Sequence, residues 1–176
     1  MSMNTQIKKN ISTSIQSFHL PKYDEIPDSG LYLDQTVQFI NGYLYIFPDL
    51  EVTPYMISNY VKKGLISRST KKLYSREQIA YLIFIAFAKN VLSMENIRLF
   101  NNIQKNSYEL KKAYEYFRLE LLNVMEYVFG LKEDLATIGE EDTSEKLLLR
   151  NTIIAVSHKL YLEKVCAEIA KLQETK

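Results

Sequence analysis

Basic side chains are concentrated in one part of this chain. Residues 52–90 hold seven lysines and arginines and one acidic residue, whereas the whole sequence has a net charge of only +1. A positive excess confined to one stretch indicates an anionic partner, such as the phosphates of nucleic acid. The basic residues of this stretch are Lys62, Lys63, Arg68, Lys71, Lys72, Arg76 and Lys89.

A helix over residues 54–63 would present polar side chains suited to reading bases. Thr53 followed by Pro54 is a typical N-cap with proline at the first helical position. The apolar face holds Ile57, Tyr60, Val61 and Gly64, spaced for one side of a helix. The opposite, base-facing side holds Tyr55, Ser58, Asn59 and Lys62. Asparagine can form a paired hydrogen bond with adenine in the major groove, so this helix is the expected recognition helix.

A small basic hairpin is expected directly after this helix. Residues 65–68 and 72–74 could pair as two short strands around residues 69–71, so that the 66–74 hairpin forms a wing. Arg76 begins the next helix, where backbone amides also attract phosphate. The residues expected to hold phosphates are Lys63, Arg68, Lys71, Lys72 and Arg76.

The elements that must position these residues are helices. Few glycines (5) and prolines (4) favour long helices with short connections, so a mainly α fold is expected. Asp34 can cap a first helix, and Ser75 with Gln78 forms a capping box for an apolar helix that ends near residue 90. Ser93 can cap another short helix. We expect residues 1–20 to be mobile or loosely packed, residues 21–106 to form one domain, and residues 107–176 to form a C-terminal helical region for dimerisation or effector binding.

Two interpretations fit the helix expected at residues 107–129. Its apolar side chains alternate at spacings of four and three residues and form a seam of Leu110, Tyr114, Phe117, Leu121, Val124 and Val128. The seam could pair with a second copy to make a homodimer. It could instead pack on a last helix at about residues 143–173, in which Leu148, Ala155, Leu162 and Ile169 repeat every seven residues. The aromatic rings in the seam favour this intramolecular bundle.

Several classes of protein and site are not expected. The longest apolar run, residues 80–88, is too short to span a bilayer, and residues 1–17 do not resemble a secretory signal, so a cytoplasmic location is expected. His19 and His158 lie far apart with no cysteines at ligand spacing, so no metal site is expected. Cys166 has apolar neighbours typical of a core thiol. No phosphate-binding loop or catalytic constellation is present, so neither a cofactor nor enzymatic activity is expected.

The sequence resembles two families. Residues 53–66 and 71–80, with the junctions at 33–35 and 91–93, resemble the bacterial domain of unknown function 1836 over roughly residues 20–130, a family with no activity to transfer. More distantly, Tyr60, Gly64, Leu65, Ile66 and Tyr74 are similar to the end of the recognition helix and the wing of MerR-type regulators. Lys72 stands where those regulators have an arginine, and the two arginines of their recognition helix fall at Tyr55 and Ser58. The resemblance implies a winged helix-turn-helix fold.

These observations lead to three functional hypotheses. The first is a MerR-like transcription regulator that binds duplex DNA, with the 54–63 helix in the major groove and the 66–74 hairpin as a wing. The second is a protein–protein interaction module that keeps the winged scaffold and meets an acidic partner through the same face. The third is a small-ligand sensor, which requires a pocket between the C-terminal helices.

Overall fold

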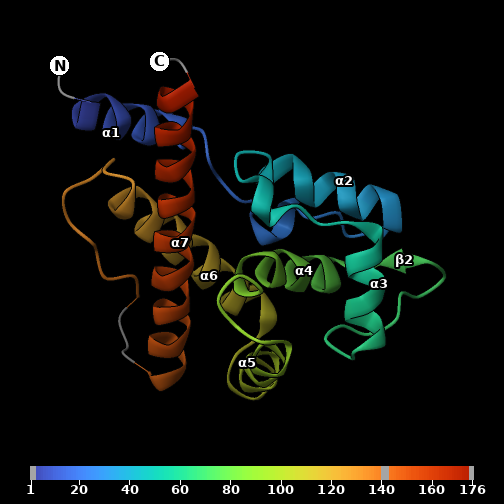
Figure 1. Ribbon diagram of the computed structural model, residues 1–176. Coiled ribbons are helices and arrows are strands. Elements are labelled where there is room, and N and C mark those ends of the chain that lie inside the picture. The colour runs from blue at the N-terminus through green and yellow to red at the C-terminus, as the bar shows by residue number, and fades with distance from the viewer. Residues whose placement is uncertain (1–2, 140–142, 175–176) are drawn as a thin grey trace.

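The chain is mainly helical, as predicted. The computed structural model describes residues 3–139 and 143–174, and Figure 1 shows their arrangement. In that part of the chain, no helix is long and apolar enough to cross a membrane. The elements in order are α1 (Met3–Ser14), η1 (Tyr23–Glu25), β1 (Leu31–Tyr32), α2 (Leu33–Leu44), η2 (Pro48–Leu50), α3 (Pro54–Lys62), β2 (Leu73–Tyr74), α4 (Arg76–Ala88), α5 (Met94–Ser107), α6 (Leu110–Val128) and α7 (Ser144–Glu174).

Three predicted helix starts are confirmed by their caps. The side chains of Thr53, Ser75 and Ser93 each accept a hydrogen bond from the backbone N–H three residues later. Gln78 completes the capping box by accepting from the backbone N–H of Ser75 at 2.9 Å. The start of α2 differs from the prediction: Tyr32 occupies the N-cap position, and Asp34 lies within the first turn. Short-range signals therefore fix where most of these helices begin.

Helix α4 is the centre of the fold. It contacts α2, α6 and α7, and Figure 1 shows it running between the α2/α3 end and the α6/α7 end of the molecule. Its side chains are buried on most sides, as expected from an apolar run without a polar face. The core residues that α4 supplies include Ile79, Leu82, Ile83, Ile85 and Phe87. The arrangement of α2, α3, α4 and the small sheet is compatible with a winged helix.

The sheet differs from the predicted hairpin. Strand β2 pairs antiparallel with β1, so that Leu31 is opposite Tyr74 and Tyr32 is opposite Leu73. The expected strand at residues 65–68 does not form. The carbonyl oxygens of Ser67 and Arg68 accept hydrogen bonds from Nε2 of Gln78 instead, at 2.8 and 3.3 Å. The hairpin is therefore reduced to a tight turn between Thr70 and Leu73, which form a single antiparallel bridge.

The N-terminal segment forms a helix, which corrects the expectation of loose packing over residues 1–20. Ile7, Ile11 and Ile15 recur every four residues and are buried, with Ile11 only 1% exposed. Helix α1 packs on α7, where Nδ2 of Asn10 donates to Glu168 at 3.0 Å. Figure 1 shows α1 crossing the end of α7. The isoleucine spacing is a helical signal that the polar composition of this segment obscured.

The predicted seam of α6 lies inside this chain. Tyr114, Phe117, Leu121 and Val124 are buried, and α6 packs chiefly against α7. The intramolecular bundle is thus present, and a homodimer through residues 107–129, which stays a prediction, would have to use other faces of α6. The opposing face of α7 was predicted wrongly. The repeat of Leu148, Ala155, Leu162 and Ile169 is exposed, as is Cys166, and the buried apolar side chains are Ile153, Val156 and Leu160.

Candidate nucleic-acid interface

Helix α3 presents its predicted polar face to solvent. It lies at the end of the molecule opposite α7, beside the small sheet (Figure 1). Ile57 and Tyr60 are 0% and 2% exposed, which fixes the rotation of the helix about its axis. Of the predicted base-facing side chains, Tyr55 is 81% exposed, Ser58 and Lys62 are exposed, and Asn59 is half-buried. The structure therefore places all four on the accessible side, with Asn59 at its margin.

The C-terminal end of α3 is held in a defined position. Gly64 has a φ of +69°, and the N–H groups of Gly64 and Leu65 donate to the carbonyls of Val61 and Tyr60, which is a Schellman motif. Helix α5 adds two contacts that the sequence did not reveal. Nη2 of Arg98 donates to the Lys63 carbonyl, and Nδ2 of the buried Asn101 donates to the Leu65 carbonyl at 3.1 Å.

The turn of the hairpin projects two lysines. Lys71 and Lys72 have φ angles of +52° and +67°, and the backbones of Thr70 and Leu73 exchange two hydrogen bonds of 3.1 and 2.9 Å. Positive φ at both central residues of a two-residue loop defines a type I′ turn. This turn usually contains asparagine and glycine, so lysine at both positions costs conformational energy. Both lysine side chains are exposed.

Five predicted cationic residues are exposed on α3 and on the loop and turn that follow it, and they are called here, together, the α3–hairpin surface. Each of them is exposed, and none forms an ion pair with another residue in the described part of the chain. Exposed cations without a protein partner remain available for an external anion, and several of them together bind phosphates in a salt-dependent way. The members of this surface are Lys62, Lys63, Arg68, Lys71 and Lys72.

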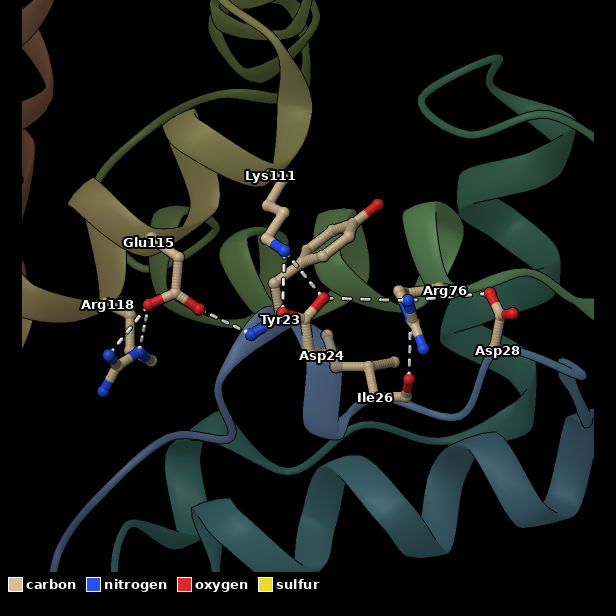
Figure 2. Close-up of polar contacts among 8 residues, drawn as sticks. All are labelled: Tyr23, Asp24, Ile26, Asp28, Arg76, Lys111, Glu115 and Arg118. Atoms are coloured by element: carbon tan, nitrogen blue, oxygen red, sulfur yellow. Dashed lines mark hydrogen bonds and ion pairs between the residues drawn. The ribbon is translucent and has the colours of Figure 1, made fainter.

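Arg76 is placed differently from the other predicted phosphate ligands. Figure 2 shows its guanidinium between two aspartates, with Nη1 3.6 Å from Asp28 and 3.9 Å from Asp24. Its Nε donates to the Ile26 carbonyl at 2.7 Å, and the group lies 5.6 Å from the centre of the Tyr23 ring. The structure therefore engages Arg76 in tying the start of α4 to the segment around η1.

The same polar cluster reaches α6. Nζ of Lys111 lies 2.7 Å from an Asp24 carboxylate oxygen, and this hydrogen bond lowers the pKa of Asp24. The backbone N–H of Tyr23 donates to Glu115 at 2.6 Å, and Glu115 in turn pairs with Arg118 at 2.8 Å (Figure 2). The contacts of Tyr23 and Asp24 with α6 join segments far apart in the sequence, so sequence spacing gave no sign of them. The remaining basic residue, Lys89, is also engaged, donating to the Glu51 carbonyl at 3.0 Å.

Fold and surface together define a class: a mainly helical protein with a two-stranded antiparallel sheet, which carries an exposed helix and a basic turn at one end. The chain belongs to the family described as domain of unknown function (DUF1836), which matches residues 21–117. This confirms the first of the two resemblances. The matched range includes α3, the hairpin and α5. Searches of curated proteins and of solved structures gave no match.

Proposed function

We propose that this protein binds duplex DNA as a MerR-like transcription regulator, with α3 in the major groove and the turn at residues 70–73 as a wing. The observation that supports this most is the α3–hairpin surface, in which five exposed cations lie on α3 and on the loop and turn directly after it. A helix needs one buried face to hold it and one accessible polar face to enter the groove, and α3 has both. The cations bind phosphates and set the position of the helix, and the side chains of α3 contact base edges.

The side chains of α3 offer specific chemistry to base edges. The hydroxyl of Ser58 donates to the Pro54 carbonyl at 2.9 Å, so its oxygen is presented mainly as an acceptor. Asn59 offers both a donor and an acceptor, which suits adenine. Tyr55, which is 81% exposed, reaches sugar or phosphate, and Lys62 lies in the last turn of the helix. The preferred base sequence follows from the contacts of Ser58 and Asn59, because contacts with sugar or phosphate carry no sequence information directly.

Fluorescence anisotropy with a labelled mixed-sequence duplex tests the proposal. At physiological salt we expect a Kd of about 1–100 μM and at low salt tighter binding, with a decline in affinity of about 0.9 log units per log unit of salt for each phosphate contacted. Five contacts would give a slope of about −4.5. Replacing Lys62 and Lys63 with glutamine should lower affinity and flatten this slope.

A matched control removes the same charge elsewhere. Lys8 and Lys9 are exposed on α1, away from the α3–hairpin surface, so replacing both with glutamine should leave the slope unchanged. Equal effects of the two double variants would show that binding depends on net charge rather than on this surface. Absence of binding at about 100 μM protein and low salt would overturn the proposal, because it is weaker than ordinary non-specific affinity.

A further inference from the structure

A pocket of about 550 Å³ lies among α4, α5, α6 and the beginning of α7. Its volume falls within the range of small-molecule sites in proteins, which is roughly 300–1,000 Å³. It is separate from the α3–hairpin surface, because its lining includes none of the five cations of that surface. Phe84 of α4, Phe100 of α5 and Phe117 of α6 all line it. The pocket is thus built by the helices that form the middle of the molecule.

The walls of the pocket are aromatic and apolar. The rings of Phe84 and Phe100 are stacked with centroids 6.1 Å apart, and Phe117 meets Phe84 edge to face at 5.5 Å. The polar groups deeper in the wall are already used by the protein. The hydroxyl of Tyr81 donates to Gln104, and the amide nitrogen of Gln104 donates to the Tyr108 carbonyl at 2.7 Å. A ligand therefore meets mainly hydrocarbon surface, which favours an apolar body.

Two lysines, Lys112 and Lys146, and one acidic residue, Glu145, line the pocket. More positive than negative charge therefore surrounds the pocket. Lys112 lines it and is exposed, and its ammonium lies 6.0 Å from the centre of the Tyr108 ring. Lys112 forms no ion pair with another residue of the described part of the chain. A cation at the edge of an aromatic pocket matches a ligand with an apolar body and one anionic end, because the body is buried while the charge stays near solvent and Lys112.

We propose that this pocket binds a small apolar carboxylate. The hydrocarbon part lies against Phe84, Phe100 and Phe117, and the carboxylate lies at Lys112. The basic surface around α3 does not enter this assignment, so the site exists whether or not the protein binds DNA.

Helix α5 connects the pocket with the end of α3. Phe100, Asn101 and Gln104 line the pocket, while Arg98 and Asn101 of the same helix donate to the Lys63 and Leu65 carbonyls. A ligand that favours one position of α5 therefore acts on the residues that hold α3. If the proposed DNA binding is correct, on which this step rests, ligand and duplex change each other's affinity by the same factor.

Titration calorimetry with decanoate and the full chain, without DNA, tests the site. We expect one saturable site per chain. Ala113 lines the pocket, so Ala113→Phe should abolish binding by filling it. Ala155 is exposed on α7 and lines no part of the pocket, so Ala155→Phe is the matched control and should bind decanoate normally. Equal affinity of both variants, or no heat with the unmodified protein, would overturn the proposal.

The role of Lys112 is tested by a substitution at this position. Because the side chain is exposed, we expect the variant to fold normally. Lys112→Gln should weaken decanoate binding about fivefold and leave binding of decanol, which has no charge, unchanged. Equal losses for both ligands would refute the carboxylate assignment. Coupling is then measured by repeating the decanoate titration with duplex present. An unchanged decanoate affinity in a protein that binds both ligands would refute the link through α5, whereas absence of duplex binding would refute only the proposed function.

Discussion

Substitutions at the two lysines of the hairpin turn should remove positive charge and at the same time stabilise the fold. Lys71 and Lys72 occupy the two positive-φ positions of a type I′ turn, where asparagine and glycine are preferred. A left-handed conformation costs an ordinary residue about 1–2 kcal/mol, and the greater freedom of glycine in the unfolded chain offsets about 0.4–1 kcal/mol of the gain. The double substitution Lys71→Asn, Lys72→Gly should therefore raise the free energy of unfolding by about 1 kcal/mol.

In this double variant, thermal stability should rise while affinity for DNA falls. For a chain of this size, 1 kcal/mol corresponds to a rise in Tm of about 2–4 °C, which thermal unfolding followed by circular dichroism resolves. In the anisotropy assay the slope of log affinity against log salt should become less steep by about 1.8, because two phosphate contacts are lost. A more stable protein that binds DNA less well cannot owe its lost affinity to unfolding.

Each measurement can refute a separate part of this reasoning. A fall in Tm would mean that the turn does not favour asparagine and glycine, and so is not of type I′ in solution. An unchanged salt slope would remove the hairpin from the proposed DNA contact. The Lys8→Gln, Lys9→Gln variant of α1 again serves as the charge control, and its slope should equal that of the unmodified protein.

Four further variants test other parts of the structure. Tyr55 is 81% exposed, so Tyr55→Ala should leave the Tm unchanged. The same substitution should lower duplex affinity, because it removes a proposed contact with sugar or phosphate. A fall in Tm would contradict the exposed position of the ring. Arg76→Ala removes a charged hydrogen bond and should cost about 2 kcal/mol of stability while leaving the salt slope as it is. Ile11→Ala should cost about 2–5 kcal/mol in urea unfolding, and a loss below 1 kcal/mol would show that α1 is not part of the core. Burial raises the pKa of Glu120 in the folded protein, so its contribution to stability is present at low pH and is lost as the pH rises above 4.5. Over that rise, the Tm of the unmodified protein should fall relative to the Tm of the Glu120→Gln variant. A constant difference between the two Tm values would contradict this prediction.

Local signals in the sequence predicted the helix starts and the accessible face of α3. Thr53, Ser75 and Ser93 act on backbone groups three residues away, so their effect is encoded in a short stretch. The same holds for Ile57 and Tyr60, whose spacing places them on one side of α3 and leaves Tyr55 on the other. Contacts between distant segments could not be read in this way. Neither the link from Arg76 to the Ile26 carbonyl nor the support of α3 by α5 follows from any spacing.

The inward face of α7 was mispredicted because two stripes of this helix share the same period. Leu148, Ala155, Leu162 and Ile169 recur every seven residues, and Leu149, Ile153, Val156 and Leu160 also recur at spacings of four, three and four. Either stripe could face α6 by pattern alone. Packing against α1, α4 and α6 together decides the rotation of α7, and that choice depends on the whole fold.

Helix α6 continues beyond the end of the segment that matches the family. The family match ends at residue 117, whereas α6 continues to Val128 and its side chains Leu121 and Val124 are fully buried. A fragment that stopped at residue 117 would keep about two turns of this helix and would lose α7, which covers it. The segment that matches the family therefore does not contain the whole of the core that its own helices help to form.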